Sequence, residues 1–527
     1  MGSCRPGCAR EWRMRILKHT LCLGIMAEET IRSWRRPLLL GLIFTVLLGT
    51  GTGLAWLLAR RNASGAFRVL LITPPPPPGG LEASAGRAIG AMVQELLEHR
   101  GGFAVTAVTA VPDQLGALQG QARTLLVLLE PRRQGEALLL SYRFVWGSQL
   151  ARGTIPWVLR EGAALPPNQA FAAFLHTFPR VLQAPDDGLI PRNAEVFWDL
   201  VQASSWRLQN QHLEEALALA ERATQREPSS ASTWFLLANL RYRKMLNSPA
   251  SFRQEQAETE AQLRRGLLLV PAHPRGTFLL SLLTTDAGNQ REALDLLLQA
   301  RRRQPYNPTL LTGIAYAARG AGLLPLARRA MDLRDGLAFS QVQSQAVDIT
   351  CLYTGEIQRF EASLKEQTGH LRSTSGVLPF YRGYLALVRG DHPQAHQEFQ
   401  AASALVNGYP NILRLSEIFD LILQGRKDEA WKKLREYDQE RIGMREPDGE
   451  FTIRLAEAYA LMGDRASAMD MASRAFARGF GCTEWYERSP MLEPLRSLPK
   501  WKALMEHIRA RQKLMEERFP IGLLETN

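Results

Sequence analysis

The stretch from Gly288 to Ala327, GNQREALDLLLQARRRQPYNPTLLTGIAYAARGAGLLPLA, contains the pattern that decides the fold. A glycine is followed five residues later by an alanine, and the pair Gly288 and Ala293 returns 34 residues further on as Gly322 and Ala327. Glycine adopts the backbone conformation of a tight turn without steric cost, and alanine leaves room for one helix to pack against another. The stretch therefore predicts a helix, a tight turn and a second helix, repeated along the chain.

The same pair returns three more times towards the carboxyl end. The further copies are Gly390 with Ala395, Gly425 with Ala430, and Gly463 with Ala468. Successive glycines are separated by 34, 68, 35 and 38 residues, and Gly355 lies within one residue of the place where the gap of 68 predicts a missing member. A period of about 34 residues is typical of helical hairpins that stack into a solenoid.

Other residues fit the same period. Trp234, Leu237 and Ala238 match the W-x-x-L-G start of a first helix, and Pro228, Pro271 and Pro305 are expected to stop second helices. From Ala216 to Ala293 there are 77 residues, nine more than two repeats, and we assign the surplus to an insertion at residues 248–256.

On these residues the chain resembles tetratricopeptide-repeat proteins over residues 193–478, with about eight hairpins, and another kind of helical solenoid is the alternative. The resemblance implies a mainly α fold, an α-solenoid whose concave groove holds a peptide or helix of a protein partner. The glycines and alanines of the five pairs are then packing residues, not reactive ones.

The amino end predicts a membrane anchor. Residues 37–58, PLLLGLIFTVLLGTGTGLAWLL, carry no charge and at about 1.5 Å per residue reach roughly 33 Å, enough to cross a bilayer. We expect a transmembrane helix at 37–59 after a basic cytoplasmic tail at 1–36, whose true start is Met1 or Met26. A buried core helix and a cleaved signal peptide are the alternatives, but the stretch is long for a signal peptide and ends in Arg60-Arg61.

The charge of the chain supports this topology. Ten Lys and Arg against three acids in residues 1–61 supply +7 of the formal net charge of +12. The excess of Lys and Arg before the apolar stretch favours a cytoplasmic amino terminus. We therefore expect the chain to sit in the inner membrane of a bacterium, with its bulk outside the cytoplasm. Because the charge brackets the apolar stretch, no nucleic-acid partner is expected.

Small residues within the predicted span suggest a homodimer. Thr45, Gly49 and Gly53 fall four apart, a spacing that lets two helix backbones approach closely. We expect a chain carrying both Gly49→Ile and Gly53→Ile to lose self-association in membranes, measured by crosslinking. Unchanged self-association in that variant would refute a dimer through this face.

Residues 66–185 predict a small α/β domain. The expected strands and helices, in chain order, are a strand at Phe67–Thr73, a helix at Arg87–Arg100, strands at Phe103–Val111, Thr124–Glu130, Ala137–Trp146 and Gln149–Leu159, and a helix at Asn168–Leu182. This order resembles the TolB-like amino-terminal domain, which accompanies tetratricopeptide repeats in bacterial cyclases, transcription regulators and kinases. A run of five prolines stands where that family has a Pro-Phe turn.

The segment at residues 479–520 predicts a cap. Its sequence SPMLEPLRSLPKWKALMEHIRARQ, residues 489–512, is similar to the closing segment of repeat arrays in membrane cyclases, CadC-like regulators and kinases. The matching residues are Leu492, Pro494, Leu495, Arg496, Pro499 and Trp501. We expect Leu495, Leu498, Trp501 and Leu504 to cover the open end of the solenoid.

No enzyme is predicted. The chain lacks the kinase marks, the P-loop, the G-x-S-x-G elbow and the H-E-x-x-H motif, so no catalytic residue and no cofactor is expected. His392 and His396 have the four-residue spacing of a metal pair but no third ligand, and Asp391 with Pro393 reads as a helix start, so no metal site is expected.

Two functions remain open on this sequence. The first is a membrane-anchored scaffold for protein–protein interactions at the cell envelope. The second is an extracytoplasmic sensory subunit that signals to a separate cytoplasmic kinase or cyclase.

Overall fold

The predicted membrane segment lies outside the part of the chain that the structure describes. The computed structural model describes residues 67–73, 81–100, 102–108, 124–134, 137–146, 149–157, 167–176, 188–209, 212–247, 252–337, 349–368, 376–405, 410–443 and 448–525. The tail at 1–36, the span at 37–59 and the pair Gly49 and Gly53 therefore lie outside the described residues. Within these ranges, no helix is both long and apolar enough to cross a bilayer.

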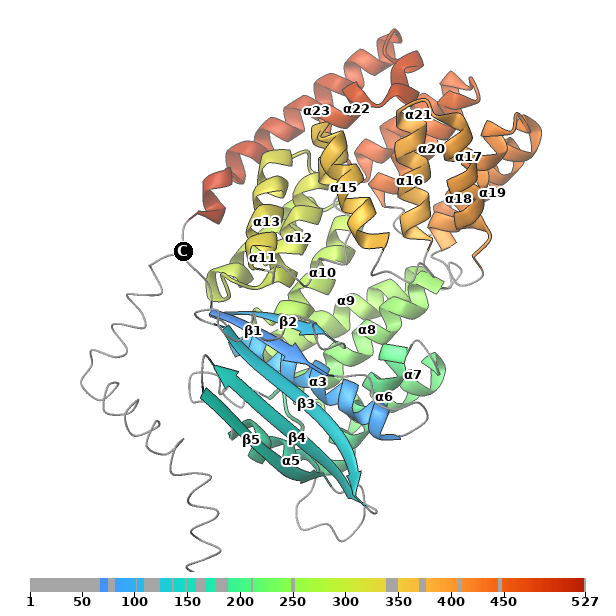
Figure 1. Ribbon diagram of the computed structural model, residues 1–527. Helices are drawn as coiled ribbons and strands as arrows, with labels where there is room; N and C mark the ends of the chain where they lie inside the picture. The colour runs from blue at the N-terminus through green and yellow to red at the C-terminus, as the bar shows by residue number, and fades with distance from the viewer. Residues whose placement is uncertain are drawn as a thin grey trace, which may run out of the picture. The chain divides into compact units, whose positions relative to one another are not determined.

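Residues 67–527 form one compact unit, and the predicted boundaries near residues 185, 193 and 478 fall inside it. The described elements of this unit are mainly α-helical, with one five-stranded sheet at the amino end (Figure 1).

The sheet has the order β2-β1-β3-β4-β5. Its strands are β1 (Phe67–Ile72), β2 (Phe103–Val108), β3 (Thr124–Gln134), β4 (Ala137–Trp146) and β5 (Gln149–Trp157). β1 runs parallel to β2 and β3, whereas β3, β4 and β5 pair antiparallel. A helix of 20 residues, α3 (Leu81–Arg100), connects the parallel strands β1 and β2, as parallel pairing requires.

Side chains of β1 alternate between two apolar environments. Val69 and Leu71 pack with α3 residues such as Ile89 and Val93, whereas Leu70 and Ile72 pack with Leu126 on the opposite face. All are essentially inaccessible to solvent, which explains why the strand reads as a continuous apolar run and not as an alternating one.

The sheet elements lie close to the predicted ranges, with differences at their ends. α3 begins at Leu81, six residues before the predicted helix start, and β3 continues through Pro131 to Gln134. Pro131 pairs with Leu140 in the antiparallel ladder, so the proline does not end the strand. The closing helix α5 (Pro167–His176) begins one residue before the predicted start.

After α5 the described helices pair in chain order. The pairs are α6 (Ala194–Gln209) with α7 (Leu213–Arg226), α8 (Ala231–Asn247) with α9 (Phe252–Leu269), α10 (Pro274–Asp286) with α11 (Gln290–Arg303), α12 (Pro308–Gly320) with α13 (Leu324–Leu337), α14 (Thr350–Thr354) with α15 (Ile357–Thr368), α16 (Val377–Val388) with α17 (His392–Ser403), α18 (Pro410–Leu423) with α19 (Lys427–Gly443), and α20 (Gly449–Leu461) with α21 (Arg465–Ala477). These eight hairpins form the tetratricopeptide-like array that the repeat period predicts.

The surplus of nine residues lengthens one hairpin. Residues 252–256, the described part of the predicted insertion, are helical and open α9. α8 and α9 have 17 and 18 residues, against 13 and 14 in α10 and α11. The second helices α7, α9 and α11 each end two residues before the prolines at 228, 271 and 305.

The glycines of the repeat pattern occupy the turns between paired helices. They all have positive φ, between 73° and 86°, and they are Gly288, Gly322, Gly355, Gly390, Gly425 and Gly463. At the first turn, His212 adopts a left-handed conformation with φ 50°, although it is not a glycine.

The alanines of the five pairs lie on the second helices of their hairpins, and each is fully buried. They are Ala293 on α11, Ala327 on α13, Ala395 on α17, Ala430 on α19 and Ala468 on α21. A larger side chain at such a position would force the two helices of the hairpin apart.

The chain after α21 folds back over earlier hairpins. It forms α22 (Thr483–Arg488), the 3-10 turn η3 (Pro490–Leu495), α23 (Pro499–Arg518) and η4 (Ile521–Leu524). Leu495, Trp501 and Leu504 are buried with α20 and α21, as expected of a cap. Leu498 is only partly buried against the same cluster.

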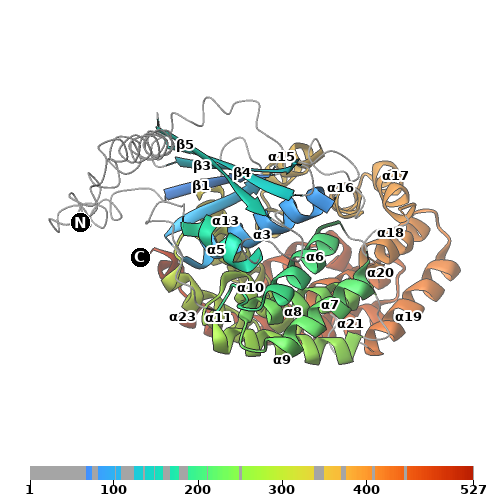
Figure 2. The ribbon, with the colours of Figure 1, turned by 90° about the horizontal axis from the view of Figure 1, so that it is seen from below.

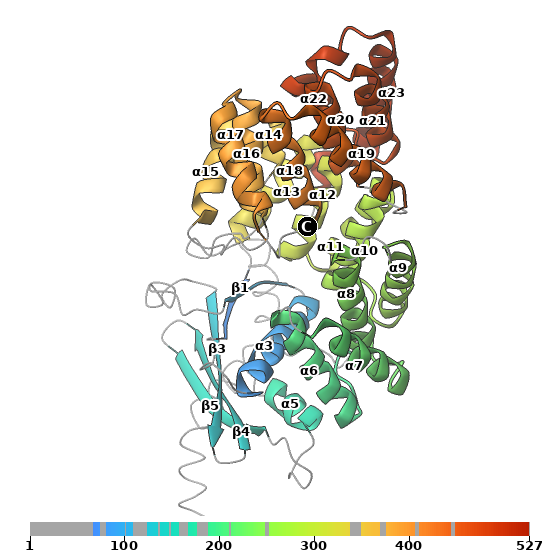
Figure 3. The same cartoon turned by 90° about the vertical axis from the view of Figure 1, so that its right-hand side faces the viewer.

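The far end of this segment reaches the third and fourth hairpins. Arg301 of α11 donates to the carbonyl oxygens of Leu523 and Leu524, and Phe519 packs with residues of α11, α12 and α13. The backbone N–H of Gly481 donates to the carbonyl oxygen of Gly320 at 2.7 Å. The segment therefore covers the last hairpin and also contacts the hairpins in the middle of the array, which closes the array (Figure 3).

Two of the turn glycines therefore differ in their surroundings. A Cβ at Gly322 would collide with the carbonyl oxygen of Gly481, whereas a Cβ at Gly463 would meet nothing within 4 Å. Both residues have positive φ, near 85°, so alanine strains the backbone at either position.

We expect Gly463→Ala to lower the free energy of unfolding by about 1–2 kcal/mol, the cost of a left-handed alanine. Gly322→Ala should cost about 1–3 kcal/mol more, because its methyl group also forces the contact with Gly481 apart. Urea denaturation of the two variants measures the difference. Equal losses would mean that the carboxyl-terminal segment does not clasp the turn at Gly322.

Candidate functional site

The groove predicted to hold a partner is lined by the first helices of the hairpins, and in the first three hairpins α3 lies against it. Residues of α3, α6, α8 and α10 surround one narrow space of about 80 Å³. Figure 2 shows α3 and α5 between the sheet and the repeat helices. A helix of the chain itself therefore occupies the place expected for a partner helix, and this end of the groove is not open.

Two carboxylates of α3 meet basic residues at the start of α10. The side chain of Glu98 is 1% exposed, and its Oε2 accepts a hydrogen bond of 3.2 Å from Arg275. Glu95 Oε1 lies 3.2 Å from His273 Nε2. His273 Nδ1 accepts from the backbone N–H of Gly276, so Nε2 is the ring nitrogen on the side of Glu95.

Electrostatics support this contact. Burial raises the pKa of Glu95, but the hydrogen bond from His273 and the charges of Arg275 and Arg207 hold it below its usual value. Burial and the nearby Arg275 and Arg243 lower the pKa of Arg207 to about 10. The groove here is basic and α3 presents acids to it, so the two surfaces are complementary in charge.

In the later hairpins, the first helices converge on a buried polar cluster. The side chain of Glu457 on α20 is fully buried and accepts hydrogen bonds from Tyr384 of α16 at 2.6 Å and from Trp485 of α22 at 2.9 Å. Ser489 donates to the same carboxylate at 2.8 Å. Arg454, one turn earlier on α20, lies 3.1 Å from it.

Arg454 extends the cluster to α14. Its guanidinium donates to the hydroxyl groups of Tyr353 and Tyr384 and lies over the ring of Tyr384 at 4.2 Å. Burial raises the pKa of both tyrosines well above the usual value, so their hydroxyl groups stay protonated.

A second ion pair closes the array across its interior. Arg319 of α12 forms two hydrogen bonds with Glu450 of α20, of 3.2 and 2.9 Å, although 131 residues separate them. The hydroxyl group of Tyr353 donates to the same carboxylate. Burial lowers the pKa of Arg319, but the charge of Glu450 outweighs burial and raises it. The fourth and eighth hairpins are thus tied directly.

Beside these pairs lies a cavity of about 110 Å³. Its lining comes from α12, from Ile349 before α14, from α16 and from the start of α20. Aromatic rings of Phe380, Tyr381 and Phe451 form part of the wall, and Asp448 and Glu450 contribute carboxylates.

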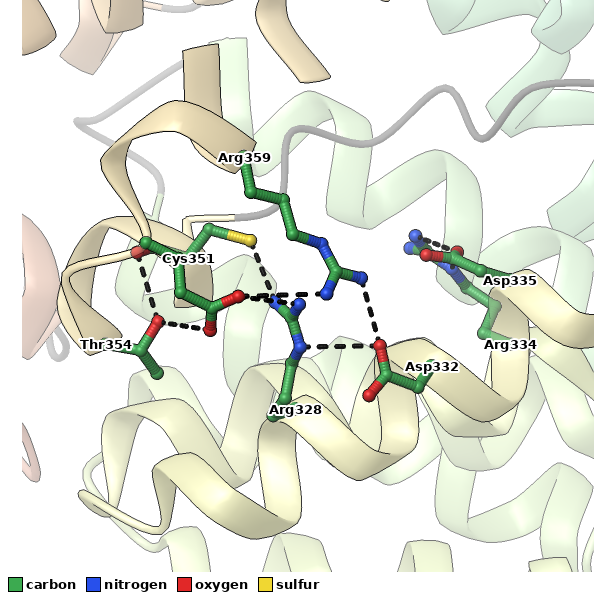
Figure 4. Close-up of polar contacts among 8 residues, drawn as sticks. Arg328, Asp332, Arg334, Asp335, Cys351, Thr354 and Arg359 are labelled. Atoms are coloured by element: carbon green, nitrogen blue, oxygen red, sulfur yellow. Dashed lines mark hydrogen bonds and ion pairs between the residues drawn. The ribbon is translucent and has the colours of Figure 1, made fainter. Parts of the chain in front are cut away.

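A more exposed ionic cluster connects α13 to α14 and α15 (Figure 4). Arg328 donates to Glu356 and to the sulfur of Cys351, each at 2.9 Å, and Arg359 donates to Asp332 at 3.0 Å. The side chains of Asp332, Glu356 and Arg359 are each at least 40% exposed, so this cluster serves to join neighbouring hairpins.

His392 and His396 lie in the first turns of helix α17, which begins at His392. Asp391 is the N-cap of α17 and accepts from the backbone N–H of Gln394, with Pro393 in the first turn, as the sequence predicts. His396 Nδ1 contacts the carboxylate of Asp420. Among the described residues, no group of three or more His, Cys, Asp or Glu side chains has the arrangement of a metal site.

The glycines and alanines of the repeat pairs are not part of the polar sites. Neither the space beside α3 nor the interior cavity has any of them in its lining. Their places are the turns and the interfaces between paired helices, so they position the sites without contacting them. These residues are Gly288, Ala293, Gly322, Ala327, Gly390, Ala395, Gly425, Ala430, Gly463 and Ala468.

The residues of the buried cluster were not predicted. The available signal was two charges three residues apart, Arg454 and Glu457, among the apolar residues of the middle of α20, GEFTIRLAEAYAL. The second helix α7 keeps its charged residues on the face that solvent reaches, whereas both of these are buried.

Comparison with known proteins adds little to this geometry. No protein-family model matches the chain, and no curated protein matches it in sequence. Among solved structures, 33 chains match, including the one titled "Crystal Structure of P58(IPK) TPR Domain at 2.5 A". The alignment covers 62% of this chain and 99% of that chain, with 13% identity and a TM-score of 0.18. At that TM-score the match carries no weight, and the fold is defined by the helix pairs themselves.

We expect Glu457→Gln to lower the free energy of unfolding by about 3–5 kcal/mol, because it leaves the buried guanidinium of Arg454 without its counter-charge. Glu506→Gln, on the exposed side of α23, is the control and should change it by less than about 0.5 kcal/mol. Urea denaturation measures both. A loss as small as that of the control would show that the network contributes nothing to stability.

Proposed function

We propose that this chain is a membrane-anchored scaffold for protein–protein interactions at the bacterial cell envelope. The uncharged segment at 37–58, with its excess of basic residues on the amino side, supports an inner-membrane anchor with the repeat unit outside the cytoplasm. The array of eight helical hairpins supports an interaction role over an enzymatic one, since stacked hairpins offer an extended surface to other chains.

The main observation in support of the proposal is that α3 packs against the first helices of the first three hairpins. The first helices of three hairpins hold an amphipathic helix through apolar contacts and two acid–base contacts, Glu95 with His273 and Glu98 with Arg275. This is the helix-in-groove mode by which repeat surfaces bind protein segments. Here the segment belongs to the same chain, so protein partners require another part of the array.

The outer face of α19 is the best-suited place. Trp431 is 38% exposed, and the guanidinium of Arg435 lies 4.0 Å from the centre of its ring. Tryptophan and arginine are the residues that most often dominate binding energy at interfaces. A rigid, already ordered Trp–Arg pair loses little conformational entropy when a partner covers it.

The cavity of about 110 Å³ favours a second candidate function, that of an extracytoplasmic sensory subunit. A ligand in that space would contact three hairpins of the array at once. In that case the chain signals through its anchor to a separate cytoplasmic kinase or cyclase.

Fractionation of cells that produce the full chain tests the anchor. We expect the chain to stay in membranes after carbonate extraction, and a variant lacking residues 37–58 to be released, because the span supplies the bilayer contact. Protease added to spheroplasts should digest the repeat unit of the full chain. Release of the uncut full chain by carbonate would contradict the proposal.

Crosslinking followed by mass spectrometry tests the partner surface. We expect a specific partner to be retained by the wild-type chain and reduced about tenfold or more by Trp431→Ala with Arg435→Ala. Leu268→Ala is the control, because Leu268 is 73% exposed on α9 without such a pair. If the double variant and the Leu268→Ala control retain the same amount of partner, the Trp–Arg pair is not the contact.

A further inference from the structure

Two basic helix ends lie together at one edge of the unit formed by residues 67–527. The last turn of α3 carries His99 and Arg100, and the last turn of α11 carries three arginines, Arg301–Arg303. The side chain of Gln304, the residue after α11, donates a hydrogen bond of 3.1 Å to the backbone carbonyl oxygen of His99. Residues 100 and 303 adjoin the two partners of this bond, so the two helix ends form one basic surface.

Three arginines of this surface carry unneutralised charge. Arg100, Arg302 and Arg303 are exposed, and within the described ranges no carboxylate forms an ion pair with any of them. Glu525, an acid near the carboxyl end, lies 3.9 Å from Arg329 instead. We call Arg100, Arg302 and Arg303 the basic edge.

Helix stability explains only part of this charge. A basic residue in the last turn interacts favourably with the dipole of its own helix. Arg301 has a further structural role, because it is 5% exposed and donates to the carbonyl oxygens of Leu523 and Leu524. The arginines of the basic edge make no such contact among the described residues, and neither of the two cavities described above has them in its lining. The basic edge is therefore an open charged surface and not a pocket for one small anion.

The chain enters the unit at this same edge. β1 and β2 run parallel with Phe67 opposite Phe103, so both strands begin at one edge of the sheet, and α3, which returns between them, ends there. The predicted membrane stretch ends at Leu58, so residues 59–66 connect it to Phe67 and span at most roughly 28 Å. Residues 59–66 include two arginines and no acid.

We propose that the basic edge docks the unit onto an anionic phospholipid surface, with the guanidinium groups of Arg100, Arg302 and Arg303 bound to lipid phosphates. The inference rests on the proposed anchor, which holds this edge within reach of the bilayer. The planar guanidinium group matches a phosphate with two parallel N–H donors. An arginine near an anionic bilayer raises the docked population about fivefold, so three arginines raise it about a hundredfold.

A free phosphate and an acidic protein segment offer the same charge but fit less well. A free phosphate binds best where several donors surround it, and the basic edge has no pocket. An acidic segment must reach the edge by diffusion, whereas a short tether keeps lipid headgroups at high effective concentration beside it. Docking also gives the array one orientation relative to the bilayer, which an anchor alone does not specify.

Arginine modification in lipid nanodiscs tests the contact. The full chain is reconstituted into discs of phosphatidylcholine and into discs with about one third phosphatidylglycerol, and mass spectrometry follows the reaction of each arginine with phenylglyoxal. We expect the basic edge to react at least about tenfold more slowly in the anionic discs. Salt at about 0.5 M should restore the rate, because it screens the attraction. Arg465, which is exposed at the start of α21, is the internal control and should react alike in both discs.

Variants identify the residues. Arg302→Gln with Arg303→Gln removes two of the three charges, so modification of Arg100 in anionic discs should return to within about fivefold of its rate in neutral discs. The matched control removes the same charge from exposed positions of α19 and α21, by Lys432→Gln with Arg465→Gln. It should leave Arg100 as protected as in the wild type.

The outcomes separate the docking from the anchor. If the chain does not stay with the discs, the anchor fails and the docking fails with it. If the chain stays but the basic edge reacts equally fast in both discs, or the double variant leaves Arg100 protected, the docking alone is wrong. Protection by added octaglutamate in neutral discs, with none from phosphatidylglycerol, would assign the edge to an acidic protein partner instead. The comparison of lipids uses the wild-type chain and needs no variant to fold.

Discussion

The arrangement of the later hairpins depends on one pair of buried charges, Arg454 and Glu457 on α20. A carboxylate without solvent is costly unless donors surround it, and here Tyr384, Trp485 and Ser489 provide hydrogen bonds in addition to the guanidinium. These donors come from α16, α22 and the turn that follows α22. Small-residue packing fixes how neighbouring helices nest, but apolar contacts tolerate sliding. A charge that needs several donors in set directions specifies one arrangement of helices that are not neighbours in the sequence.

The array is also closed, because its carboxyl-terminal part contacts the third and fourth hairpins directly. Arg319 and Glu450 connect the fourth hairpin to the eighth, and Arg301 binds the carbonyl oxygens near the carboxyl end. An open solenoid is stabilised mainly by contacts between adjacent repeats, so its ends can separate with little loss. Here, separating the eighth hairpin from the fourth would expose Glu450 and Arg319 without their partners and would open the contact at Gly322. Because closure ties the array together across its interior, the partner surface that we propose lies on an outer face, that of α19.

The sequence predicted what depends on local spacing and missed what depends on distant pairing. Glycine at a tight turn and alanine opposite a neighbouring helix are requirements within one hairpin, so pairs such as Gly463 and Ala468 reveal the hairpins directly. The strand at Phe67–Ile72 was likewise readable, since both of its faces are buried. Nothing in a repeat period encodes the contact of Arg319 with Glu450, 131 residues away. The same reason explains α3. The sequence predicted a helix of the α/β domain there, but its acids Glu95 and Glu98 identified no partner until the structure placed His273 and Arg275 beside them.

A closed array also changes how a bound ligand acts. In an open solenoid, a ligand that contacts one hairpin affects mainly its neighbours, because each repeat is coupled only to the next. The cavity here is lined by α12, α16 and the start of α20, which belong to three hairpins far apart in the sequence. Glu450 lines that cavity while it bonds to Arg319 and Tyr353, so a charged ligand in the cavity would act on the ion pair that holds the array closed. Under the sensory alternative, ligand binding and closure would be linked through the ion pair of Arg319 and Glu450, and by reciprocity whatever strengthens the closed form would strengthen ligand binding by the same factor.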